Sequence, residues 1–149
     1  MSLSATGLAA LVAGLEVDGV TIRDLDEVPQ SINGRDCPMV YPAPEKFLAL
    51  EDATQLTFGP NALWQYTYLV TYRFVQAPVG SERAMAKIIS ATVNGYINFI
   101  QALTANAQLL GAAHVKPANT PEWGVLGDPS GEQFQAADIA LRVVEYSGN

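Results

Sequence analysis

The most constraining feature of the sequence is a stretch of strict alternation from Ala62 to Val75, which reads ALWQYTYLVTYRFV. A period of two residues over this length is typical of a β-strand with two different faces. β-branched and aromatic side chains also suit a pleated, half-buried surface. One face is almost wholly apolar or aromatic, which predicts contact with a core or a partner; it carries Trp64, Tyr66, Tyr68, Val70, Tyr72 and Phe74.

The length of this strand suggests contact with another chain. At about 3.3 Å per residue, a straight strand over residues 62–75 would span roughly 45 Å. The chain has 149 residues, the size of one domain over residues 1–149, and such a domain is about 40 Å across. The strand is therefore expected to overhang its own domain unless a bulge bends it.

Composition gives two further indications. Charged residues make up 15% of the chain, well below the usual quarter. This is expected if other chains cover part of the surface, or if a small domain simply has a large core. The net charge of −7 argues against a protein that binds nucleic acid by neutralising phosphates. It suits a protein that must not adhere to nucleic acid.

The sequence offers little for catalysis or metal binding. Cys37 is the only cysteine and His114 the only histidine, which excludes an internal disulfide and a zinc site built from these two residue types alone. Neither lies in a recognisable nucleophile signature, and G-x-S-x-G, P-loop and G-x-G-x-x-G motifs are absent. Two carboxylates can still meet in space, but Asp138 and Glu145 are interpreted as charges that protect a strand edge. We therefore expect no enzyme, with no catalytic, cofactor-binding or metal residues.

Two helices are expected. Ser4 or Thr6 can cap a short helix that runs to about Leu15 and is too short to span a membrane. A long helix is predicted from Ser81 to about Asn106, with an apolar stripe that covers one face of a sheet.

Strands account for much of the rest of the chain. The pattern predicts a hairpin of 54–58 with 62–75, and Asp128 to Gly131 has the signature of a type I turn. Because the strands run mostly as hairpins and the helices are separate in sequence, the class is α+β. The sheet should be mainly antiparallel, with the long helix on one face and a short helix at the N-terminus. Further strands are expected over residues 17–25, 38–41, 123–126 and 134–146.

A proline-punctuated connection forms an extended arm at about residues 29–47. It keeps the apolar residues Met39, Val40 and Tyr41. Long loops that keep apolar residues are often contact arms. The alternative, which is slightly favoured, is a loop that packs on its own domain.

The order of these elements resembles the tail-terminator and neck proteins of long-tailed bacteriophages. The run LWQYTYLVTYRFVQAPVGS, the helix RAMAKIISATVNGYINFIQAL and the last strand IALRVVEY are similar in style to that family. The resemblance covers most of the chain but is one of architecture, without a diagnostic motif.

The resemblance implies a virion structural protein at the head–tail joint, assembled in the host cytoplasm. It would form a ring, usually a hexamer, that caps the tail tube, stops its polymerisation and docks to the head connector. DNA would pass through without specific binding, no membrane would be involved, and the family has no catalytic residues to transfer. Another neck or tube subunit would share this architecture. The side chains expected at subunit or partner contacts are Met39, Val40, Tyr41, Arg73, Trp123, Arg142 and Tyr146.

A different class of function is an α+β domain that binds a small ligand or acts as an enzyme. The aromatic strand 62–75 would then line a pocket, with Tyr66, Tyr72 and Arg73 as convergent polar groups. Burial of these side chains against the long helix would argue against that hypothesis.

Overall fold

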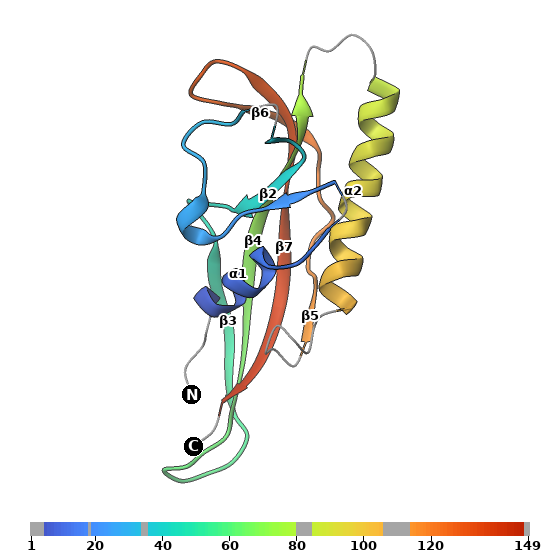
Figure 1. The fold of residues 1–149 in the computed structure, drawn as a ribbon. Helices are drawn as coiled ribbons and strands as arrows, with labels where there is room; N and C mark the ends of the chain where they lie inside the picture. Colours follow the sequence, from blue (N-terminus) through green and yellow to red (C-terminus); the bar gives the residue numbers. More distant parts are fainter. Residues whose placement is uncertain (1–4, 18, 34–35, 80–84, 106–113, 148–149) are drawn as a thin grey trace.

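The computed structural model describes residues 5–17, 19–33, 36–79, 85–105 and 114–147. It is an α+β protein with two helices and a mixed sheet of seven strands (Figure 1). None of the described helices combines the length and the apolar character needed to cross a membrane.

Two long antiparallel strands form the centre of the sheet. β4 (Trp64–Pro78) and β7 (Gln133–Ser147) pair along their whole length, with one irregularity between Val75 and Ala77. Each carries two shorter strands along its outer edge, one behind the other. β2 (Met39–Pro42) and β3 (Leu48–Gln55) pair with β4, whereas β5 (His114–Pro117) and β6 (Gly124–Gly127) pair with β7.

The sheet is mixed because β1 (Thr21–Ile22) runs parallel to β2, whereas the other described pairings are antiparallel. β1 is also much shorter than the strand predicted over residues 17–25. A 3₁₀ turn, η1 (Leu25–Glu27), ends it. Asp24 caps this turn: its carboxylate accepts from the backbone N–H of Leu25 at 2.6 Å, while Glu27 accepts from the backbone N–H of Asp24.

Both helices lie on the same face of the sheet (Figure 1). α1 (Ala5–Ala13) contributes Leu8 and Val12 to the main core, and α2 (Met85–Ala105) contributes Phe99 and Leu103. From Tyr68 onward, the apolar face predicted from the alternation is buried on this side of the sheet, because every second residue of a strand points to the same side; Trp64 and Tyr66 are half-buried. The fully buried side chains on this side of the sheet include Tyr68, Val70, Tyr72 and Phe74 of β4 and Ile139, Leu141 and Val143 of β7.

The opposite face has a smaller core at one end of the sheet. Val28 and Cys37 pack against it, and Ile32 is buried there with Met39, Tyr41 and Phe134. Asp128 fixes the chain at this point, since its carboxylate accepts from the Ser31 hydroxyl and the Ile32 N–H, both at 2.8 Å. Much of the connection at about residues 29–47 thus packs on its own domain, which is the slightly favoured of the two alternatives, because Ile32, Met39 and Tyr41 fill this second core.

The part of the fold that does extend away is the β3–β4 hairpin (Figure 1). β3 begins at Leu48, six residues before the predicted strand start at Thr54, and the connection to β4 runs over residues 56–63. A bulge between Leu50 and Asp52 interrupts the pairing. The overhang predicted from strand length is therefore found at this end of β4.

Gly95 lies where α2 packs closely against β4. A Cβ at this position would lie 3.0 Å from Phe74 Cζ and 3.5 Å from Gln76 Oε1. We expect Gly95→Leu to lower the free energy of unfolding by about 2 kcal/mol, because overpacking costs about 1–3 kcal/mol. Asn94→Leu is the matched control on the exposed side of the helix and should cost nothing. Denaturant unfolding of both variants measures the difference, and equal stabilities would contradict the close packing.

Candidate interaction surface

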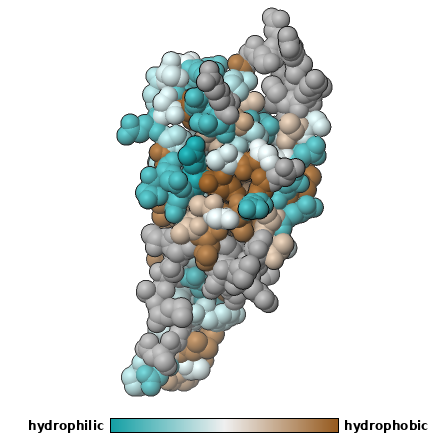
Figure 2. Space-filling model, viewed as in Figure 1, coloured by the Kyte–Doolittle hydropathy of each residue, from teal (hydrophilic) through white to brown (hydrophobic). Residues whose placement is uncertain are grey.

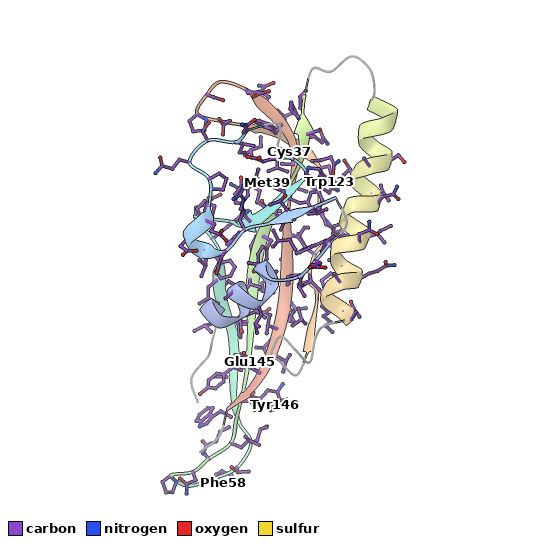
Figure 3. The ribbon with its side chains drawn as sticks, viewed as in Figure 1. Cys37, Met39, Phe58, Trp123, Glu145 and Tyr146 are labelled. Carbon is purple, nitrogen blue, oxygen red and sulfur yellow. The ribbon has the colours of Figure 1, made fainter. Side chains whose placement is uncertain are left out.

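The hairpin arm, which we define as residues 48–66, is the most exposed part of the described structure that carries large apolar side chains. All eight residues of β3 are exposed, and Leu50 is 66% exposed. Phe58 is 94% exposed and lies at the tip of the arm (Figure 3). Leu48, Leu56 and Leu63 are exposed as well. A partner could bury this surface without rearranging the core.

Hydrogen bonds hold the tip of the arm in one conformation. The backbone N–H of Leu56 donates to Leu63 O at 2.7 Å, and the N–H of Leu63 donates to the Thr57 hydroxyl at 2.7 Å. Gly59 adopts a φ of +96°, a value that a glycine accepts without strain. Because the turn is formed before any partner binds, ordering it adds little to the cost of association.

An ion pair ties the base of the arm to the sheet. Arg142 of β7 donates to both oxygens of Glu51 across β4, with an Nε–Oε1 distance of 3.1 Å. A bidentate guanidinium–carboxylate pair adds a defined geometry to the electrostatic attraction. Arg142, expected at a subunit contact, is therefore engaged within its own chain and fixes the direction of the arm.

Aromatic side chains continue the surface of the arm onto the sheet. Trp64 and Tyr66 stack with their ring centroids 6.3 Å apart, and both are half-buried. Glu145 lies opposite Tyr66, and burial together with this carboxylate raises the pKa of the neighbouring Tyr68. Tyr146, which is expected at a contact, lies on the other face of the sheet and is 48% exposed (Figure 3).

α2 provides a second exposed surface. Thr92, Phe99 and Leu103 face the sheet, whereas Val93 and Ile97 are exposed, at 49% and 42%. The space-filling view also shows apolar side chains gathered between the helices and near the arm (Figure 2). We call the exposed side of α2 its outer face; it consists of Ser90, Ala91, Val93, Asn94, Ile97, Asn98, Gln101, Thr104 and Ala105.

The middle of the sheet carries an ionic cluster on the face opposite the helices. Arg73 Nε donates to Asp138 Oδ1 at 2.9 Å, Arg73 also pairs with Glu45, and Lys46 pairs with Asp138. Burial alone would raise the pKa of Asp138, but hydrogen bonds from Arg73 and Lys46 lower it on balance. Arg73, another expected contact residue, is thus neutralised inside its own subunit.

Asp138 does not protect a free strand edge as predicted. It lies on a central strand, where Arg73 of β4 is its register partner. The edge on the other side is closed by Asn119, whose Nδ2 donates to Asp138 O at 3.1 Å and whose Oδ1 accepts from the Ala140 N–H at 2.9 Å. The prediction failed because sequence alone did not show that β7 has neighbours on both sides.

Removing the guanidinium should destabilise the protein in a pH-dependent way. We expect Arg73→Met to cost about 1–2 kcal/mol at neutral pH. That is less than the about 3–5 kcal/mol for breaking a fully buried pair, because the Asp138 side chain is 28% exposed. A lowered carboxylate pKa stabilises the fold above the unfolded pKa, near about 4. This stability is lost as the pH falls through the folded pKa.

Unfolding in urea at pH 7 and at pH 3 measures the effect, and the difference from wild type should shrink at pH 3. Lys46→Met is the control, since Lys46 is 53% exposed and exposed pairs contribute little. An equal loss for both variants would contradict a central role of Arg73.

Four other expected contact residues lie mainly inside the fold. Met39, Val40 and Tyr41 are buried, because β2 is covered on both faces. Trp123 is half-buried and packs edge-on against Phe74, with ring centroids 5.4 Å apart. Of the seven predicted contact side chains, the structure leaves Tyr146 the most exposed. The overhang of the long strand was expected from the sequence, but the tip of the arm and the outer face of α2 were not singled out as contact surfaces.

The three side chains expected to converge in a ligand pocket do not meet. Tyr72 is buried against Phe99 of α2, with ring centroids 6.1 Å apart. Arg73 points to the opposite face of the sheet, and Tyr66 lies beside Trp64 on the arm. A shallow depression of about 220 Å³ does adjoin Arg73 and Asp138, but neither Tyr66 nor Tyr72 lines it.

No protein-family model matches the chain, and no curated protein matches it significantly. Within the part of the chain that the structure describes, no three His, Cys, Asp or Glu side chains come together as a metal-binding group. The geometry that stands out is an exposed apolar arm and an exposed helix face.

Proposed function

We propose that this chain is a structural subunit that self-assembles into a ring at the head–tail joint of a long-tailed bacteriophage. The ring would cap the last ring of the tail tube, block further addition of tube subunits and present a new surface to the head connector. Its mechanism is steric and needs no catalytic group. A hexamer is the expected stoichiometry.

The hairpin arm is the observation that carries this proposal. Exposed apolar patches on a protein surface mark interaction sites, and Phe58 and Leu50 project from a preformed hairpin. An edge strand such as β3 also presents unpaired backbone groups along its outer side. Such a feature supports association with another chain more directly than it supports ligand binding.

The place of the ring in a virion rests on two further arguments. The order of helices and strands is similar to that of the tail-terminator and neck proteins. The net charge of −7 suits a conduit through which DNA slides, because an acidic wall repels phosphates. Another neck or tube subunit would have the same features, and an assembly experiment with tube subunits distinguishes these roles.

Negative-stain imaging of the purified full chain tests the ring, and tube assembly tests its place. We expect ring-shaped particles with an open centre, and open-ended filaments or particles of single-chain size would overturn the ring. When the protein is mixed with polymerising tube subunits of a phage that carries this sequence, tubes should stop growing and end in the added ring. Tubes of unchanged length would overturn the capping role.

A further inference from the structure

Two surfaces of the molecule are free of charged side chains and expose large apolar ones: Phe58 on the first, and Val93 and Ile97 on the second. The sequence contains no Asp, Glu, Lys or Arg over residues 53–72 or over residues 88–115. The first run includes the tip of the hairpin arm, and the second includes the outer face of α2. The exposed side of a surface helix normally carries charged residues, so their absence here requires an explanation.

The net charge of the chain makes this absence informative. Two copies that each carry a charge of −7 repel one another, except where their facing surfaces are neutral. The cores of protein interfaces are likewise depleted in charged residues. Exposed surfaces without charged side chains are therefore places where a second copy of this acidic chain can approach closely.

The two surfaces also differ in shape and position. Phe58 projects from the narrow tip of the hairpin arm, whereas Val93 and Ile97 lie one helical turn apart along the side of α2. A contact between two different surfaces is head-to-tail, and repeating it produces a closed ring when the rotation closes. A contact of either surface with itself would instead give a two-fold dimer.

We propose that the tip of the hairpin arm of one copy binds the outer face of α2 on the next copy, with Phe58 against Val93 and Ile97. This inference deepens the proposed function and rests on it, because it specifies the contact that would build the ring. The partner of the arm is therefore a second copy of this chain, and the outer face of α2 binds the arm of a neighbouring copy.

Cysteine cross-linking between two variants tests the contact. Phe58→Cys and Ile97→Cys are each made in a Cys37→Ser background. Burial, with the nearby Asp36 and Glu132 carboxylates, raises the pKa of Cys37 to about 11, so this thiol is a poor nucleophile, but removing it leaves a single reporter in each chain. Under mild oxidation, we expect a disulfide-linked dimer when the two variants are mixed and at least about tenfold less from either alone.

A matched control is Val125→Cys, which is 58% exposed on β6 and should not cross-link with Phe58→Cys. Strong cross-linking of Phe58→Cys with itself would overturn the head-to-tail contact in favour of a two-fold one. No mixed cross-link from a sample that light scattering shows to be assembled would overturn this contact and leave the ring standing. A wild-type sample that stays monomeric would overturn the contact and the ring together.

Discussion

Replacing Phe58 with aspartate is expected to convert the assembled protein into monomers without changing its fold. Phe58 is 94% exposed, so its side chain contributes almost nothing to the core of its own subunit. Burying an aromatic side chain contributes about 1.5–3 kcal/mol, and burying an unpaired carboxylate costs several more. Each contact should therefore weaken by at least about 100-fold, since 1.4 kcal/mol corresponds to a factor of ten.

The controls for Phe58→Asp separate a specific contact from a general effect of charge. Val125→Asp adds the same charge at another exposed apolar residue and should leave assembly intact. Phe58→Leu keeps the side chain apolar and should weaken assembly only slightly. Sedimentation velocity measures the size of each variant, and circular dichroism confirms the fold. If Phe58→Asp assembles like the wild type, the arm tip is not part of the interface.

Phe74→Ala is expected to cause the largest loss of stability. Phe74 is fully buried where β4 meets α2, with Gly95 on one side and Trp123 edge-on at 5.4 Å. Truncating a buried phenylalanine costs about 3–5 kcal/mol, because it removes apolar burial and leaves a cavity. This is a large share of the about 5–15 kcal/mol that stabilises a typical domain.

Phe58→Ala is the matched control for Phe74→Ala, since the same atoms are removed from an exposed position. Its free energy of unfolding should stay within about 0.5 kcal/mol of the wild-type value when both are compared as monomers, as is usual for surface substitutions. Urea denaturation followed by tryptophan fluorescence is suitable, because Trp123 packs on Phe74. Equal losses in the two variants would mean that Phe74 is not at the centre of the core.

Periodic elements were predicted well from the sequence. The alternation over residues 62–75 located β4 and identified its buried face, and the last strand predicted over residues 134–146 matches β7 within one residue at each end. The long helix ends at Ala105, one residue before the prediction, while its expected start at Ser81 lies outside the described residues. Long, regular patterns succeed because one face of each element is buried along its whole length.

The predictions failed where tertiary contacts decide the structure. For residues 29–47, a loop that packs on its own domain was the slightly favoured prediction. The pattern could not show that Ser31 and Ile32 lie on the second face of the sheet, because Asp128, distant in sequence, holds them there. It also could not show that β5 pairs with β7, since only four residues form that strand. Short elements carry too little periodicity to be separated from loops.

The expected contact residues show the same limit. Arg73 and Arg142 looked available in the sequence. However, Arg73 pairs with Glu45 and with Asp138 of β7, and Arg142 pairs with Glu51 of β3 across β4. The sequence signal for the contact surfaces proposed above is the absence of charge over residues 53–72 and 88–115. It identifies neutral surface only once the structure shows which of those residues are exposed.

The most direct test of the account is the absolute mass of the purified full chain, measured by light scattering over a hundredfold range of concentration. Self-assembly through the hairpin arm predicts a mass near six times the 15.9 kDa of one chain, reached cooperatively as the concentration rises. A mass of 15.9 kDa at every concentration would contradict the claim that this chain is a self-assembling ring subunit.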